Sequence, residues 1–310
     1  MKALVTGGSG FIGSNISKML LSKGVDVVVF DNLSSGNYDN IKDLPVHFIK
    51  GDVLDKDAIS DACKGIDVVF HLAASVGRQR SIDHPQLDSE INLIGTIDVL
   101  EGMRAHRVKK IVYSSSAAIF GELLFPEIDE NHPQNADSPY GVSKLAAEKM
   151  ILSYAGIYGI TAVCLRYFNI YGVNQRYDLY GNVIPIFAHR LFAGQPLIIY
   201  GDGTQTRDFV NVYDVARANV MAGLEYDKTN VFNLGSGESI TINRLAEMLQ
   251  EISGINTGID YQPERKADVK HCKANANKVY ENMGFKAVVP LEEGVKEYID
   301  WYRKNIVEAL

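Results

Sequence analysis

Cysteine is scarce in this sequence of 310 residues, which contains three. They lie far apart and form no C-x-x-C pair, which argues against a structural zinc site and is typical of a reducing compartment. The chain has no run of lysine or arginine and a net charge of −7, so neither nucleic acid nor an anionic membrane is expected as its main partner. No uninterrupted apolar stretch approaches the ~20 residues of a membrane span.

Targeting and low-complexity patterns are also missing. Glycine is reached at Gly7, too early for the apolar region of a signal peptide, so we expect a cytoplasmic protein. Internal repeats and low-complexity linkers are not visible. The composition, 46% hydrophobic and 22% charged, is that of a globular protein, and the length predicts one main domain with a smaller one.

The first informative pattern is a glycine-rich turn between a strand and a helix. Lys2–Thr6 reads as a strand, Gly7-Gly-Ser-Gly-Phe-Ile-Gly13 follows, and a helix is expected up to Lys23. Such glycines let the backbone approach a pyrophosphate, and the helix N-terminus stabilises its charge. Asp31, after the next strand, would bind the adenosine ribose hydroxyls and repel a 2′-phosphate. No arginine follows in Asn32-Leu-Ser-Ser-Gly36, so NAD is favoured over NADP; a purely structural turn is the alternative.

Strands and helices continue to alternate after this unit, which implies a parallel sheet with right-handed crossovers. We therefore predict an α/β fold, a Rossmann-type doubly wound parallel sheet with a smaller, mixed α/β C-terminal substrate-binding domain. The NAD-binding domain is expected over residues 1–169, with parts of 207–234 returning to it, and the substrate-binding domain over 170–206 and 235–310. His71, at the end of an apolar strand, is interpreted as a packed, hydrogen-bonded residue.

A third pattern is Ser138-Pro-Tyr-Gly-Val-Ser-Lys144, which predicts a helix N-terminus with Ser138 as N-cap and Pro139 in the first turn. Tyr140 and Lys144 then share one face. An ammonium about 4 Å from the phenol favours the phenolate by roughly 4 kcal/mol before desolvation is subtracted, enough to bring its pKa towards neutrality. A solvated helix face is the alternative for an isolated Y-x-x-x-K pattern.

These motifs resemble those of the extended short-chain dehydrogenase/reductase family, and within it the NAD-dependent nucleotide-sugar 4-epimerases. The resemblance covers the whole chain. It rests on Thr6–Gly13, Asp31–Gly36, His71-Leu-Ala-Ala74, Ser114–Gly121, Tyr140–Lys144, Leu165–Gly172 and Gly201–Phe209.

The resemblance implies roles for individual positions. The catalytic residues would be Ser116, Tyr140 and Lys144, with Ser116 and Tyr140 as the acid–base pair. NAD would contact Gly7, Gly10, Phe11, Ile12, Gly13, Asp31, Asn32, Ser34, Gly36, Asp52, Val53, Leu72, Ala73, Ala74, Asn92, Ser114, Tyr140, Lys144 and Tyr167. A UDP-sugar would contact Ser116, Tyr140, Asn169, Asn182, Val183, Ile198, Tyr200, Arg207, Arg265 and Asp268. An ion pair with Asp208 is the alternative interpretation of Arg207.

The reaction class follows from what comes after Ser116. Related dehydratases carry an Asp-Glu pair there and glucuronate decarboxylases a Glu, whereas this chain has Ala117-Ala118, which cannot move a proton. We therefore expect 4-epimerisation through a 4-keto intermediate, interconverting UDP-glucose and UDP-galactose and, if the small Cys272 leaves room for an N-acetyl group, UDP-GlcNAc and UDP-GalNAc.

Some functions compatible with these motifs stay open. The stretch Ser75-Val-Gly-Arg-Gln-Arg-Ser81 carries two arginines. One interpretation is that they contact the sugar or phosphate, which keeps a UDP-glucuronate 4-epimerase open. The alternative is that the stretch is a solvated loop. A dehydratase, a decarboxylase and a non-catalytic dinucleotide sensor stay open as well. The resemblance also implies a homodimer, paired through helices near Leu87–Arg104 and Ser138–Tyr158.

Overall fold

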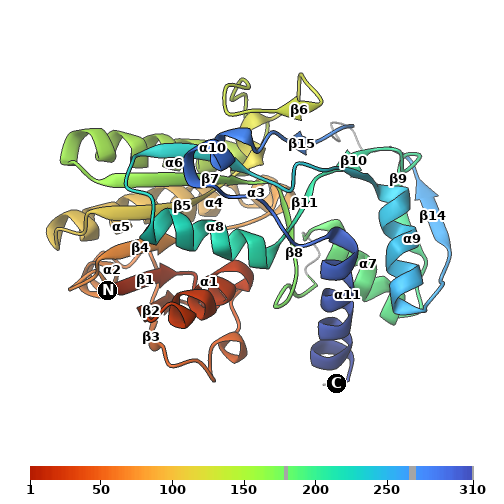
Figure 1. Ribbon diagram of the computed structural model, residues 1–310, viewed down its shortest axis with the longest axis horizontal. Helices are drawn as coiled ribbons and strands as arrows, with labels where there is room; N and C mark the ends of the chain where they lie inside the picture. Colours follow the sequence, from red (N-terminus) through yellow and green to blue (C-terminus); the bar gives the residue numbers. More distant parts are fainter. Residues whose placement is uncertain (178–180, 265–269, 309–310) are drawn as a thin grey trace. The chain divides into compact units, whose positions relative to one another are not determined.

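The computed structural model describes residues 1–177, 181–264 and 270–308, and the chain divides into two compact units (Figure 1). Unit 1 comprises Met1–Gly121, Pro133–Tyr167 and Val215–Phe232. Unit 2 comprises Glu122–His132, Phe168–Asp214 and Asn233–Leu310. Relative to the boundaries expected from the sequence, the segment Glu122–His132 joins the second unit rather than the first.

Unit 1 is built on a seven-stranded sheet with the order β12-β7-β5-β4-β1-β2-β3. The strands are β1 (Lys2–Thr6), β2 (Asp26–Asp31), β3 (His47–Lys50), β4 (Val68–His71), β5 (Lys110–Ser116), β7 (Thr161–Tyr167) and β12 (Asn230–Leu234). From β7 to β3, each strand is parallel to its neighbour. The chain builds outward from β1 to β3 and then returns to place β4 on the other side of β1, so the strand order reverses beside β1. Open parallel sheets bind ligands beyond the carboxyl ends of the strands at this reversal.

Helices cover both faces of this sheet, which confirms the predicted doubly wound fold (Figure 1). On one face, α2 (Lys56–Ala62), α5 (Gly95–Ala105) and α6 (Pro139–Tyr158) enclose a buried apolar core that includes Leu4 and Ile111. The other face carries α1 (Phe11–Ser22) and α8 (Val212–Leu224). Burial on both faces explains why the strands read as nearly continuous apolar runs.

The helix expected over 87–104 is present but is not uniform. It consists of α4 (Pro85–Ser89), a π-helical segment η2 (Glu90–Ile94) and α5. Single π-helical turns within α-helices are rare, and those that occur are often found at functional sites. A short helix that the sequence did not predict, α3 (Arg78–Asp83), precedes α4, so most of the arginine-containing stretch after β4 is helical rather than a loop.

Unit 2 is a mixed α/β unit, as predicted. Parallel pairs are β8 (Asn169–Tyr171) with β11 (Phe209–Asn211), β9 (Leu197–Tyr200) with β14 (Ile259–Gln262), and β6 (Glu127–Ile128) with β15 (Lys273–Ala274). β10 (Thr206–Arg207) and β13 (Ile240–Thr241) are antiparallel. The helices are α7 (Val183–Phe192), α9 (Ile242–Ser253), α10 (Asn277–Met283) and α11 (Leu291–Tyr302). Side chains from α7, β9, α9 and α11 form the core of this unit.

Candidate active site

The glycine-rich turn after β1 has the geometry that a dinucleotide requires. Gly7 has φ +67°, and a Cβ added there would lie 2.8 Å from the backbone nitrogen of Ala73. A Cβ on Gly13 would lie 2.3 Å from the Gly7 carbonyl oxygen, so neither position accepts a side chain without backbone movement. The N-cap of α1, Gly10, makes no side-chain capping hydrogen bond, and the first turn of the helix has no acidic residue. The backbone N–H groups of this turn therefore suit a phosphate, with Phe11 and Ile12 opening the helix.

Asp31 is fixed against this turn at the end of β2. Its Oδ2 accepts a hydrogen bond from the Ser9 N–H (2.9 Å), and its Oδ1 accepts one from the Leu33 N–H (2.8 Å). A Cβ on Gly36 would lie 3.0 Å from both carboxylate oxygens, so glycine leaves that side of the carboxylate open. Each carboxylate oxygen retains acceptor capacity for a ribose hydroxyl.

The adjacent candidates for the adenosine half are also brought together. The Asn32 Nδ2 donates to Asp52 Oδ2 (2.9 Å), and the Ser34 N–H donates to Asn32 Oδ1 (2.9 Å). Val53 is buried. A Cβ added to Gly95 would lie 2.7 Å from the Val53 Cγ2, so the glycine lets the helix pack closely against Val53. Asn32, Ser34 and Asp52 thus form one hydrogen-bonded group.

At the end of β4, Thr6 orders the backbone that follows. Its hydroxyl oxygen accepts hydrogen bonds from the N–H groups of Leu72 (3.2 Å) and Ala73 (3.3 Å) and lies 2.7 Å from His71 Nδ1. The His71 Nε2 lies 3.0 Å from the Thr96 hydroxyl, and burial lowers the pKa of His71 to about 3. His71 is therefore a neutral, packed and hydrogen-bonded residue, as the sequence predicted, and it positions the backbone leading to Ala74.

Ser116, at the end of β5, lies beside Tyr140 in the first turn of α6, and Lys144 follows one helical turn later. Ser138 caps α6 by accepting a hydrogen bond from the Gly141 N–H (3.2 Å), which confirms the predicted helix start. Ser116 hydrogen-bonds to the Tyr140 side chain. The Lys144 side chain is buried, with its Nζ 4.5 Å from the centre of the Tyr113 ring. A phenol, a hydroxyl and an ammonium at one site can transfer a proton to and from a substrate hydroxyl.

Burial sets the protonation of this trio, contrary to the simple expectation for a phenol beside an ammonium. Burial raises the pKa of Tyr140 to about 12, and the hydrogen bond from Ser116 offsets only part of this rise. Burial also lowers the pKa of Lys144 to about 8, against the opposing negative charges of Asp88 and Glu148. Since desolvation disfavours both charged forms, Lys144 alone does not bring Tyr140 towards neutrality.

The backbone after Ser116 packs closely against the start of α6. Ala117 and Ala118 lie in a 3-10 turn, η3 (Ala117–Phe120), and the Ser116 hydroxyl accepts a hydrogen bond from the Ala118 N–H (3.2 Å). A Cβ on Gly141 would lie 2.4 Å from the Ala118 carbonyl oxygen. Gly141 therefore permits the approach of η3 to the catalytic helix, a requirement that the sequence analysis missed although the glycine beside Tyr140 was its signal.

A buried ion pair that the sequence analysis also missed ties α6 to the sheet. Arg166 in β7 donates to Glu148 in α6 through Nη2 (2.7 Å) and Nε (3.1 Å). The Ser115 hydroxyl donates to the same carboxylate at 2.6 Å. Because Glu148 lies one helical turn after Lys144, this pair fixes the rotation of the catalytic helix about its axis.

The remaining cofactor candidates in unit 1 belong to two hydrogen-bonded groups. Ser114 Oγ lies 3.0 Å from the Tyr167 hydroxyl, which donates to Asn219 Oδ1 (2.9 Å). Asn92, in the π-helical segment, accepts from the Ser75 N–H (2.8 Å) and donates to the Ser75 carbonyl oxygen (3.1 Å). Their contacts with the nicotinamide half remain predictions.

Apart from Ser116 and Tyr140, the described candidates for the UDP-sugar lie in unit 2. Asn169 Nδ2 donates to the Asp208 carbonyl oxygen (3.0 Å), and Asn182 Nδ2 donates to the Ile170 carbonyl oxygen (3.2 Å) at the start of α7, before Val183. Ile198 lies in β9, and Arg265 and Asp268 lie outside the described residues.

Arg207 lies in β10, beside Asp208. The Asp208 carboxylate accepts hydrogen bonds from the N–H groups of Ser236 (2.7 Å), Gly237 (3.1 Å) and Ala274 (3.0 Å). The Arg207 Nη1 donates to the Thr206 carbonyl oxygen at 2.9 Å. Binding of a UDP-sugar by Arg207 stays a prediction, with the ion pair to Asp208 as its alternative.

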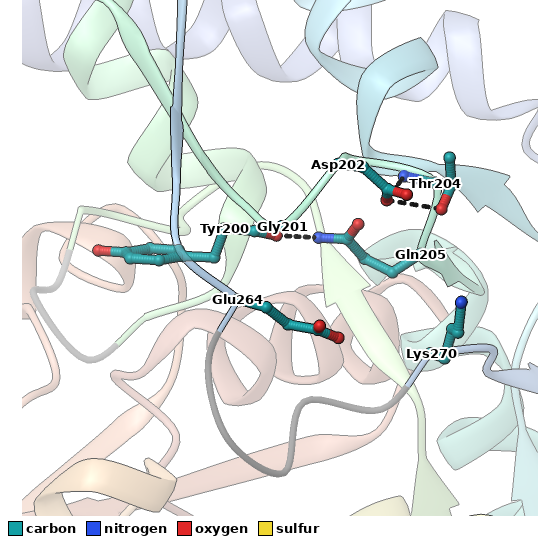
Figure 2. A pocket seen from close by; sticks show the side chains of 7 residues that line it. All are labelled: Tyr200, Gly201, Asp202, Thr204, Gln205, Glu264 and Lys270. Carbon is teal, nitrogen blue, oxygen red and sulfur yellow. Dashed lines mark hydrogen bonds between the residues drawn. The ribbon is translucent and has the colours of Figure 1, made fainter.

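A polar pocket in unit 2 includes one of these candidates, Tyr200 at the end of β9 (Figure 2). Gln205 Nε2 donates to the Tyr200 carbonyl oxygen at 2.8 Å, as the dashed line shows. The residues lining it are Tyr200, Gly201, Asp202, Thr204, Gln205, Glu264 and Lys270. Hydrogen-bonding and charged groups dominate, which suits a polar ligand group.

The arginines after β4 have partners on the protein. Arg78 forms an ion pair with Asp137 (3.1 Å), two residues before Pro139, and both side chains are partly exposed. Across the described residues, no cluster of three or more histidine, cysteine or acidic side chains could hold a metal ion. Within residues 1–177, 181–264 and 270–308, no helix combines the length and apolar character that a membrane span needs.

Comparisons with known proteins agree with this geometry. Residues 3–235 match the model of the NAD-dependent epimerase/dehydratase family. A Methanocaldococcus jannaschii protein provisionally named UDP-glucose 4-epimerase is 40% identical, covering 97% of this chain and 98% of its own. The structure of Thermotoga maritima UDP-glucose 4-epimerase with UDP-glucose has a TM-score of 0.93 at 37% identity, over 99% of this chain and 100% of that one.

Further relatives differ in substrate or reaction. A UDP-N-acetylglucosamine 4-epimerase from Methanobrevibacter ruminantium has a TM-score of 0.94 at 34% identity, over 98% of this chain and 99% of that one. Relatives at 32% and 30% identity are named UDP-glucuronate 4-epimerase and dTDP-glucose 4,6-dehydratase. These relatives share a family but differ in their sugar substrate or reaction. This chain belongs to that family, the NAD-dependent epimerase/dehydratase family of nucleotide-sugar enzymes.

Proposed function

We propose that this protein is a UDP-hexose 4-epimerase that uses bound NAD+. The observation that supports this proposal best is the group of Ser116, Tyr140 and Lys144, together with the two alanines that directly follow Ser116. Tyr140 would take the proton of the sugar 4-hydroxyl, and bound NAD+ would supply the oxidant for the hydride at C4 and a positive ring beside the phenol. Because Ala117 and Ala118 have no group that could eliminate water, the 4-keto sugar turns over in the site and recovers its hydride on the opposite face.

The preferred sugar is proposed from Cys272. Its N–H donates to the Thr206 carbonyl oxygen (3.2 Å), which places the backbone of this residue beside β10 and Arg207. A side chain as small as cysteine leaves room for an N-acetyl group, so we include UDP-GlcNAc/UDP-GalNAc with UDP-glucose/UDP-galactose. The relative named UDP-N-acetylglucosamine 4-epimerase supports this breadth.

UDP-glucuronate is the second candidate substrate. It is favoured by the arginines after β4 and by the relative that is named a UDP-glucuronate 4-epimerase. The ion pair of Arg78 with Asp137 weakens it, because that cation already faces a carboxylate. A non-catalytic dinucleotide sensor is disfavoured because Tyr140 and Lys144 are both present, with Ser116 hydrogen-bonded to Tyr140.

We also propose a cytoplasmic homodimer. Apolar side chains are exposed on the α4–η2 and α6 helices at Leu87 (50%), Ile94 (44%) and Val142 (54%). Pairing of these helices in an isologous interface would bury them, and such interfaces are the commonest in oligomers. Sedimentation as a monomer at micromolar concentration would refute the dimer.

The reaction is tested with purified protein and a panel of UDP-sugars. UDP-galactose and UDP-GalNAc are expected to give their C4 epimers without added reductant. Release of water or CO2, or no turnover of any UDP-sugar, refutes the proposal. Tyr140→Phe removes the proton acceptor and is expected to lower turnover by roughly 10²-fold or more while NAD+ binding is retained. An equal loss of NAD+ affinity would contradict the catalytic assignment of Tyr140.

A further inference from the structure

A buried carboxylate beside the catalytic turn has no role in the proposed reaction. Asp88, at the end of α4, is 1% exposed, and its Oδ1 has no hydrogen-bond partner among the described residues. Its Oδ2 accepts a hydrogen bond of 2.6 Å from the Ser143 hydroxyl. A length of 2.6 Å is typical of a hydrogen bond that a hydroxyl donates to a carboxylate.

Ser143 connects this carboxylate to the catalytic residues. It lies in α6 between Tyr140 and Lys144, and its hydroxyl is 3.0 Å from the Tyr140 carbonyl oxygen. The same hydroxyl accepts a hydrogen bond from Asn92 Nδ2 (3.0 Å). Asn92, Ser143 and Asp88 therefore form a chain in which each donor points to the next acceptor, an arrangement in which hydrogen bonds strengthen one another. The chain joins α4 and the π-helical segment to the first turn of α6.

The charge of Asp88 acts on both reacting groups. It favours the protonated forms of Lys144 and Tyr140, whose pKa values it raises. Four more groups face Lys144: Tyr113 in β5, His71 in β4, Cys164 in β7 and Glu148 in α6. His71 and Tyr113 are neutral at pH 7, because burial lowers the pKa of the first and raises that of the second. Burial keeps Cys164 a neutral thiol by raising its pKa, and Arg166 binds the Glu148 carboxylate in two hydrogen bonds. Among these described groups, Asp88 is therefore the carboxylate that no cation contacts.

We propose that Asp88 is a positioning residue of the catalytic turn, which holds Ser143 between Tyr140 and Lys144 and supplies the fixed negative charge that keeps the buried Lys144 protonated. This assignment deepens the proposed function and rests on it for the reaction that is measured. Its carboxylate touches neither the reacting atoms nor the ammonium directly. It acts through the Ser143 hydroxyl and through its field in a site with little water, where an unscreened charge has a long reach.

The test separates the charge of Asp88 from its hydrogen bond. Asp88→Asn keeps an oxygen that accepts from Ser143 but removes the charge. It is expected to move both limbs of the pH profile of kcat/KM to lower pH by about one unit, because Lys144 and Tyr140 both lose a proton more easily. Ser143→Ala keeps the charge, so it is expected to lower kcat several-fold without moving either limb. Asp83→Asn, which removes an exposed carboxylate from the preceding helix, is the matched control and is expected to change neither.

A second measurement needs no sugar. Tyrosine labelled with ¹³C at Cζ, with the Tyr140 signal assigned by its loss in Tyr140→Phe, is titrated in the NAD+ complex. Asp88→Asn is expected to move that titration to lower pH by about one unit, whether or not a UDP-sugar is turned over. An unmoved titration or unmoved limbs overturn the assignment of Asp88. If Asp88→Asn does not fold, Ser143→Ala still decides, since wild-type kcat in that variant overturns the positioning role. A shifted titration without turnover of any UDP-sugar refutes the proposed reaction and supports the role of Asp88.

Discussion

The buried ion pair between Glu148 and Arg166 offers the sharpest test of how the catalytic helix is held. The side chains are 0% and 3% exposed, and two hydrogen bonds join them, with Ser115 as a third donor to Glu148. Glu148→Gln keeps the shape and one acceptor oxygen but removes the negative charge that faces Arg166. Removing one partner of a buried pair costs about 3–5 kcal/mol of unfolding free energy. At roughly 2–4 °C per kcal/mol for domains of this size, we expect the Tm to fall by roughly 10 °C.

Two comparisons make this result interpretable in thermal and urea unfolding. Asp300→Asn breaks an exposed pair with Lys296, in which the side chains are 55% and 69% exposed, and it is expected to lower the Tm by less than about 2 °C. The double change Glu148→Leu/Arg166→Met replaces both charges by apolar groups and is expected to recover most of the loss. If Glu148→Gln melts within about 2 °C of wild type, the charge of Arg166 is not held by Glu148, and the reasoning fails.

Three further predictions concern the cofactor and substrate. Gly13→Ala places a Cβ 2.3 Å from the Gly7 carbonyl oxygen, so NAD+ affinity measured by calorimetry is expected to fall at least tenfold, whereas an exposed Gly24→Ala control should bind normally. Cys272→Tyr is expected to reduce kcat/KM for UDP-GalNAc at least tenfold more than for UDP-galactose; equal losses would refute the assigned position. Because Lys144 acts as an ammonium with a pKa of about 8, the alkaline limb of the kcat/KM profile is expected to fall as pH rises through that value. A profile that stays flat to pH 10 would contradict this.

Local patterns predicted most of unit 1 from the sequence. The glycine turn, Asp31 and the start of α6 depend on residues a few positions apart, where steric limits, capping and strand alternation act directly. The Asp88–Ser143 and Arg166–Glu148 contacts could not be predicted in this way. They join residues 55 and 18 positions apart through the packing of α4, α6 and β7, and single acidic or basic residues in an amphipathic pattern indicate a solvated face as readily as a buried partner.

The same distinction explains the error about Tyr140. From the sequence, the nearest charge was Lys144, and Coulomb attraction alone predicts a phenol close to neutrality. The sequence pattern did not reveal how deeply these groups are buried. Burial opposes the Coulomb attraction at both groups, because it raises the pKa of the phenol and lowers that of the ammonium. The roles of these residues stay predictions from the sequence, and the balance of their charges depends on how deeply the sheet and α6 enclose them.

This balance also determines when Tyr140 can act in the proposed reaction. With a pKa raised to about 12 in the protein's own field, the phenol keeps its proton at neutral pH and is not a base by itself. A positive nicotinamide bound beside it would stabilise the phenolate and so let Tyr140 take the 4-hydroxyl proton. The raised pKa of Tyr140 would then hold that proton until it returns to the new hydroxyl. Burial of the phenol would in this way link proton transfer to the redox state of the cofactor.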